Sequence, residues 1–63
     1  MKNRYTLEVL KYGGPSIHVE IEADDIQIND GVIKFVYDGG DRWIPISVYP
    51  ADKTIISRIV KLK

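Results

Sequence analysis

The sequence predicts a small all-β domain, an antiparallel meander or partly open barrel of five to six strands. Three observations predict it. Short runs of β-branched and aromatic residues recur, Gly, Pro and Asp separate them, and several runs alternate between apolar and polar residues. A chain of 63 residues makes one domain, residues 1–63. The alternative is a curved sheet with a C-terminal helix.

The first two runs, residues 4–11 and 16–23, predict a hairpin. Within them the apolar residues Tyr5, Leu7, Val9, Ile17, Val19 and Ile21 lie at odd positions, so one face of the pair is apolar. The Gly-Gly-Pro between them is typical of a turn. With a loop at 12–16, the expected pairs are Val9 with Val19 and Leu7 with Ile21.

A change of parity at Asp24-Asp25 predicts a bend or a bulge, because apolar residues are odd before this step and even after it. Asp30-Gly31 then predicts a two-residue hairpin turn, since a type I′ turn requires positive φ at both positions. The pairs expected across this turn are Ile28 with Ile33 and Ile26 with Phe35.

The next turn, residues 38–41, joins the fourth run to the fifth. With Tyr37 opposite Arg42, both hairpins place their apolar residues on one face, which predicts a meander over residues 25–49. Pro45 cannot donate to a strand ladder, so we expect it on an edge strand or at a bulge. The residues of this predicted core are Ile26, Ile28, Ile33, Phe35, Ile44, Ile46 and Val48.

The last run, residues 54–62, fits two structures. Its β-branched residues favour a strand, and pairing with the first run would help to close a small barrel. Some of its apolar residues also recur at helical spacing, and Asp52 can cap a helix there.

The composition argues against several functional classes. Without cysteine there is neither a disulfide framework nor a thiolate metal site, and with one histidine we expect no metal and no cofactor. No nucleophile, base and orienting group form a plausible constellation, so we predict no catalytic residues and no enzyme. No apolar stretch reaches the length of a membrane span, so we expect a cytoplasmic protein without a membrane partner.

The charges balance, with 9 basic and 9 acidic residues, which argues against a strongly basic nucleic-acid binder. Acidic residues concentrate in 20–41 and basic residues in 42–63, so the two halves can pair within the fold or between subunits. Small domains without disulfides or metals often gain stability by oligomerising, and we expect a homo-oligomer.

One candidate site is a charged patch on the first two strands. The expected register places Glu8 opposite Glu20, and like charges in such a pair are unfavourable unless a cation neutralises them. His18 makes the patch a candidate metal or pH-sensitive site, although pairing with a nearby base or solvation explains it more simply. The patch comprises Glu8, His18, Glu20 and Glu22.

The second candidate is the face of the meander opposite its core, where Trp43 would lie opposite Val36. Exposed apolar faces with Trp and Tyr are typical of interaction surfaces. Alternatively, the terminal strands fold over this face and bury it. The predicted interaction face comprises Val32, Lys34, Val36, Trp43, Pro45 and Tyr49.

These observations favour a non-enzymatic protein-interaction module that binds itself or another protein. The alternative is a small barrel that binds single-stranded nucleic acid or a nucleotide, with aromatic residues that stack on bases beside Arg42 and Lys34. The neutral net charge and the acidic residues of 20–30 make this alternative weaker.

Residues 20–40, EIEADDIQINDGVIKFVYDGG, resemble a pattern found in short proteins of phages, prophages and bacterial genomes. In that pattern an Ala-Asp step leads to a strand, an Asp-Gly or Glu-Gly turn and a strand that contains Phe. The resemblance implies a hairpin and a phage-type accessory protein that binds and blocks a host or defence protein. It implies no catalytic residues.

Overall fold

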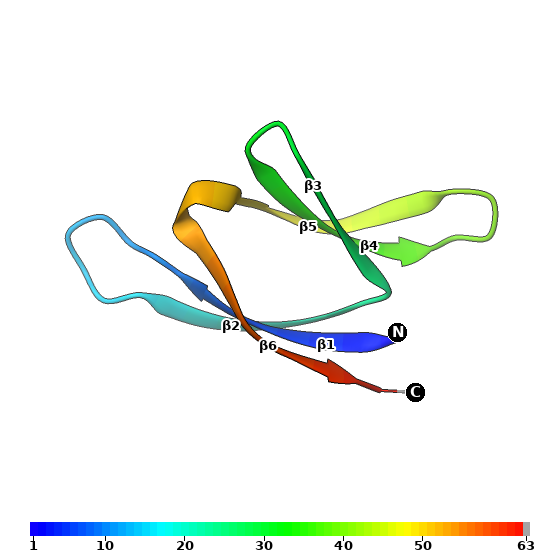
Figure 1. The fold of residues 1–63 in the computed structure, drawn as a ribbon, viewed down its shortest axis with the longest axis horizontal. Helices are drawn as coiled ribbons and strands as arrows, with labels where there is room; N and C mark the ends of the chain where they lie inside the picture. The colour runs from blue at the N-terminus through cyan, green and yellow to red at the C-terminus, as the bar shows by residue number, and fades with distance from the viewer. Residues whose placement is uncertain (63) are drawn as a thin grey trace.

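Six antiparallel strands form two three-stranded sheets, which confirms the all-β prediction (Figure 1). The computed structural model describes residues 1–62, and Lys63, the last residue of the predicted domain, lies outside the described residues. The sheets have the strand orders β2-β1-β6 and β3-β4-β5 and do not close into a barrel. The elements are β1 (Asn3–Val9), β2 (Ile17–Ala23), β3 (Asp25–Asn29), β4 (Val32–Asp38), β5 (Trp43–Pro50), the 3-10 turn η1 (Ala51–Lys53) and β6 (Thr54–Lys61).

The β3–β4 hairpin has the predicted turn and register. Asp30 and Gly31 have φ angles of 51° and 76°, so both occupy the left-handed region that a type I′ turn requires. The observed pairs are Ile26 with Phe35 and Ile28 with Ile33, as predicted.

The last run is a strand, and the predicted alternative of a C-terminal helix is wrong. β6 pairs antiparallel with β1 along the whole of β1. The pairing shifts register between Thr6 and Leu7, which leaves Ser57 as an extra residue of β6. The hydroxyl of Ser57 donates to the Thr6 carbonyl oxygen at 3.1 Å.

The β1–β2 hairpin has a longer loop than predicted, over residues 10–16. The observed pairs are Leu7 with Val19 and Val9 with Ile17, in place of Val9 with Val19 and Leu7 with Ile21. The backbone N–H of Leu10 donates to the carbonyl oxygen of Lys53 at 2.7 Å, which extends the contact of this end of β1 with the β6 side. The observed register differs from the predicted one by two residues. Because side chains alternate with a period of two, each still lies on its predicted face.

The β4–β5 loop also differs from the prediction. The observed pairs are Asp38 with Trp43 and Tyr37 with Ile44, in place of Tyr37 with Arg42. The N–H of Gly39 donates to the Arg42 carbonyl oxygen at 2.9 Å and closes the loop. Ile44 lies close to Gly39, where an added Cβ would come within 2.5 Å of the movable Ile44 Cδ1, and in the same loop Gly40 has a φ angle of 100°, which favours glycine.

A β-bulge at Ile46 changes which side chains of β5 point inward. The pairs on either side of it are Val36 with Pro45 and Phe35 with Ser47. Because Ile46 is an extra residue, the residues after it exchange faces, and Tyr49 turns to the core while Val48 turns outward. The prediction that Pro45 lies on an edge strand or at a bulge is confirmed on both counts.

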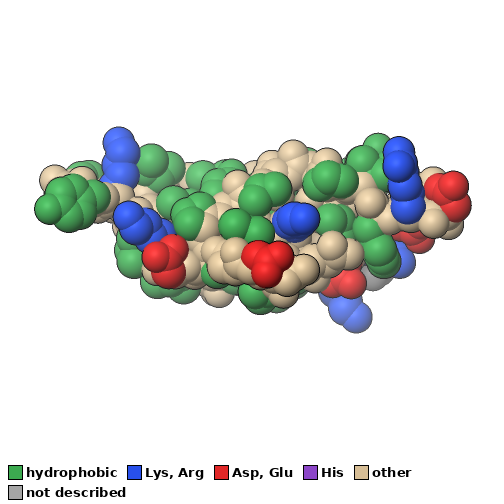
Figure 2. Space-filling view, turned by 90° about the horizontal axis from the view of Figure 1, so that it is seen from above, with side chains coloured by type: hydrophobic (Ala, Val, Ile, Leu, Met, Phe, Trp, Pro, Cys, Tyr) green, Lys and Arg blue, Asp and Glu red, His purple; other side chains and the backbone are tan. Residues whose placement is uncertain are grey.

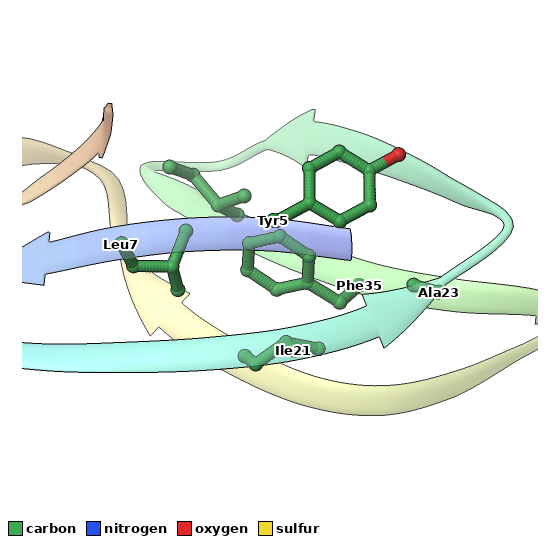
Figure 3. Close-up of a cluster of buried hydrophobic side chains, with 6 residues drawn as sticks. Tyr5, Leu7, Ile21, Ala23 and Phe35 are labelled. Carbon is green, nitrogen blue, oxygen red and sulfur yellow. The ribbon is translucent and has the colours of Figure 1, made fainter. Parts of the chain in front are cut away.

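The core lies between the two sheets. Figure 3 shows Tyr5 and Leu7 of β1 and Ile21 and Ala23 of β2 around Phe35 of β4. The buried core side chains are Tyr5, Leu7, Ile21, Ala23, Ile33 and Phe35, with Ile26, Tyr49 and Ile56 among the partly buried residues packed against them.

Three residues of the predicted core are exposed instead. Ile28 is 66% exposed because it lies on the edge strand β3 beside the turn, which stands clear of the other sheet (Figure 1). Ile46 is 40% exposed at the bulge, and Val48 is 52% exposed beyond it. Ile44 is only half-buried, at the end of β5.

Asp24 forms the corner between the two sheets, as the change of parity predicted. Its backbone N–H donates to the Val36 carbonyl oxygen at 2.9 Å. Its carboxylate accepts the N–H of Asp38 at 2.8 Å and the N–H of Lys2 at 2.9 Å. The hydrogen bonds from Asp38 and Lys2 keep the pKa of the Asp24 carboxyl below the usual range of an aspartate.

We expect Asp24→Asn to lower the melting temperature at pH 7, because an amide offers only one acceptor oxygen. The native pKa is depressed, so the carboxylate contributes its full stabilisation above the unfolded pKa of about 3.9, and loses it as the pH falls through the native pKa. The difference between wild type and variant should therefore shrink below about pH 4. Thermal melts at pH 7 and pH 2.5 measure it, and an equal difference at both values would contradict this role.

We expect Thr54→Val to stabilise the fold. The Thr54 hydroxyl is buried and has no hydrogen-bond partner among the described residues, and an unsatisfied buried hydroxyl costs about 1–3 kcal/mol. Valine has nearly the same shape, so urea unfolding should show a gain of about 1 kcal/mol. Thr6→Val, at a half-buried site, is the control and should change stability by less than about 0.5 kcal/mol.

Candidate interaction face

Each sheet has an outer face that the other sheet does not cover. Strand alternation and the observed register place one residue set on the outer face of the β3-β4-β5 sheet, which we call the Trp43 face. Its residues are Asp25, Gln27, Asn29, Val32, Lys34, Val36, Asp38, Trp43, Pro45, Val48 and Pro50.

All the residues predicted for the interaction face lie on the Trp43 face except Tyr49. Tyr49 packs edge-on against Phe35, with ring centroids 5.9 Å apart, so its assignment to this face is wrong. Val48 takes its place, although the alternation of β5 predicted that Val48 lies in the core. The signal that could have found Val48 is Pro45, which indicates a bulge and hence an exchange of faces beyond it.

The Trp43 face is open to solvent around a buried centre. Val36, in the middle strand, is buried, whereas Trp43 is 44% exposed and Val48 is 52% exposed. The terminal strands β1 and β6 belong to the other sheet and pack on the opposite side, so the expectation that they bury this face is wrong. Figure 2 views the molecule from above Figure 1, where β3, β4 and β5 lie uppermost, and shows hydrophobic side chains along the molecule with acidic and basic ones between them.

The Trp43 face also carries opposite charges along β4. Lys34 is half-buried between its register partners Gln27 and Val48. One carboxylate oxygen of Asp38 accepts the N–H of Gly40 at 2.9 Å, which orients the side chain. Within residues 1–62, neither Lys34 nor Asp38 forms an ion pair.

The predicted charged patch lies on the outer face of the β2-β1-β6 sheet, but its residues do not converge. The observed register of β1 and β2 differs from the predicted one by two residues. Glu8 therefore lies opposite His18 and not opposite Glu20, so the predicted clash of like charges is wrong. Glu8 accepts the Ser16 hydroxyl at 2.8 Å. Arg4 pairs with Glu22 at 3.2 Å, and Glu20 lies opposite Thr6. These contacts give each charge a local partner or leave it in solvent.

The described residues contain no group of three His, Asp or Glu side chains placed to hold a metal ion. Residues 1–62 enclose no detectable pocket. Over the same residues, no helix has the length and apolar character needed to cross a membrane.

Comparisons with protein-family models, with curated proteins and with solved structures find no match to this chain.

Proposed function

We propose that this chain is a non-enzymatic protein-interaction module that binds a second copy or another protein through the Trp43 face. The observation that carries the proposal is the half-exposed Trp43 on a sheet face that no other strand of the described chain covers. Tryptophan is among the commonest anchors of protein interfaces. Side chains that project from paired strands need little backbone ordering when they bind, which favours affinity.

The charges near Trp43 favour a protein partner over the alternative of a nucleic acid. Asp25 and Asp38 lie on the same face, and Asp41 lies in the adjoining loop. Phosphate groups would be repelled by these carboxylates, and affinity for nucleic acid depends on cations that neutralise phosphates. A short oligonucleotide should therefore show no salt-dependent binding.

The resemblance of residues 20–40 to phage and prophage proteins adds a biological setting to the proposal. In this setting the module acts in the cytoplasm, where it binds and blocks a host or defence protein. A fluorescent fusion expressed in the source cell tests the compartment.

We expect Trp43→Ala to weaken partner binding about 30-fold while the fold remains intact, because a hot-spot anchor contributes about 2 kcal/mol or more. Pull-down from source-cell lysate, read by mass spectrometry, and sedimentation velocity measure partner binding and self-association. Ile55→Ala is the matched control, since Ile55 is 49% exposed on the outer face of the other sheet. A folded Trp43→Ala variant that keeps wild-type binding in both assays would refute the proposed face.

A further inference from the structure

We propose that the Trp43 face binds a second copy of this chain, with the two faces stacked about a two-fold axis that crosses β4 at Val36. This inference rests on the proposed function and names its partner. It is carried by the positions of Lys34 and Asp38 on either side of Val36.

The two charges are placed symmetrically for such an axis. Lys34 and Asp38 each lie two residues from Val36 on the same face of β4. We place a two-fold axis between the two faces, parallel to them and perpendicular to β4. This axis stacks β4 of one chain antiparallel on β4 of the other. Lys34 of one chain then lies across from Asp38 of the other, and the interface contains this ion pair twice.

Both groups are available for this contact. Within residues 1–62, Lys34 has no carboxylate partner, although it is half-buried. The Gly40 N–H orients one oxygen of Asp38 and leaves the exposed carboxylate able to accept further bonds. Packed sheets lie about 10 Å apart, a gap that the lysine and aspartate side chains can span together.

The same axis pairs the apolar residues of β5. Trp43 is in register with Asp38, and Val48 with Lys34, so Trp43 of one copy meets Val48 of the other. Pro45, in register with Val36, meets its own copy near the axis. A stable interface buries about 800 Å² on each partner, which is under a fifth of the 4530 Å² accessible surface of this chain.

The charges also disfavour a two-fold axis parallel to β4. An axis parallel to β4 would stack Lys34 on Lys34 and Asp38 on Asp38, and like charges in contact are repulsive. Among the charged residues of the Trp43 face, the perpendicular axis brings only Asp25 opposite its own copy, at the rim on β3. This like-charge contact weakens the dimer, so its removal provides an independent test of the axis.

The test uses two charge-reversal variants, Lys34→Glu and Asp38→Lys, measured by sedimentation equilibrium at about 50 mM salt. We expect wild type to dimerise, and each variant alone to have a Kd raised by at least about tenfold, because each homodimer then contains two repulsive pairs. Mixed in equal amounts, the variants should form a heterodimer of near wild-type affinity. In it the introduced glutamate faces the introduced lysine, and the unchanged Asp38 of one chain faces the unchanged Lys34 of the other. Circular dichroism verifies that both variants fold, and Lys53→Glu, an exposed reversal in η1, should leave the dimer unchanged.

Asp25→Asn keeps the test decisive if Asp38→Lys does not fold. We expect this substitution to lower the Kd by about twofold to fivefold at low salt, since one like-charge contact is removed. A wild-type chain that stays monomeric, or a dimer indifferent to Lys34→Glu, would overturn the inference. The proposed function would still stand in either case if Trp43→Ala abolished capture of another protein, so the two failures are distinguishable.

Discussion

The contact of Phe35 in β4 with Tyr5 in β1 joins the two sheets, and the rest of the structure depends on it. The Phe35 ring is fully buried and lies edge-on to both tyrosines, with centroids 5.3 Å from Tyr5 and 5.9 Å from Tyr49. Burial of such a ring stabilises a fold by roughly 1.5–3 kcal/mol, and each aromatic contact adds about 0.5–1.5 kcal/mol. A domain of this size has a total stability of only about 3–9 kcal/mol, so this cluster contributes a large share.

Two backbone irregularities bring the residues of this cluster together. The bulge at Ile46 turns Tyr49 toward Phe35, and the corner at Asp24 passes the chain from β2 in one sheet to β3 in the other. Asp24 is bonded to the backbone of Val36, Asp38 and Lys2, so it ties both sheets together where they meet. Neither irregularity is a defect, because each places side chains that a regular ladder would misplace.

The Trp43 face follows from the same constraint. A chain of 63 residues has enough strands for two sheets, and stacking them uses one face of each. Trp43 and Val48 of β5 therefore stay about half exposed, because no further layer within residues 1–62 covers them. A small domain that leaves such a face open has much to gain from a partner, since its own core is marginal. In the proposed dimer, the positions of Lys34 and Asp38 on either side of Val36 limit how the second copy can be oriented.

The sequence by itself left β6 open between a strand and a helix, but it determined the first five strands, the facing of β1 and β2, and the register of β3 and β4. It did so because side-chain alternation and the Asp30-Gly31 turn are local and admit one geometry. The predicted registers of the β1–β2 and β4–β5 hairpins differ from the observed ones by two residues, because glycine-rich loops fit several lengths. Only the tertiary structure decided that Tyr49 faces inward and Val48 outward. A bulge can form at several positions of a strand, and the space beside Phe35, which Tyr49 fills, selects the one at Ile46.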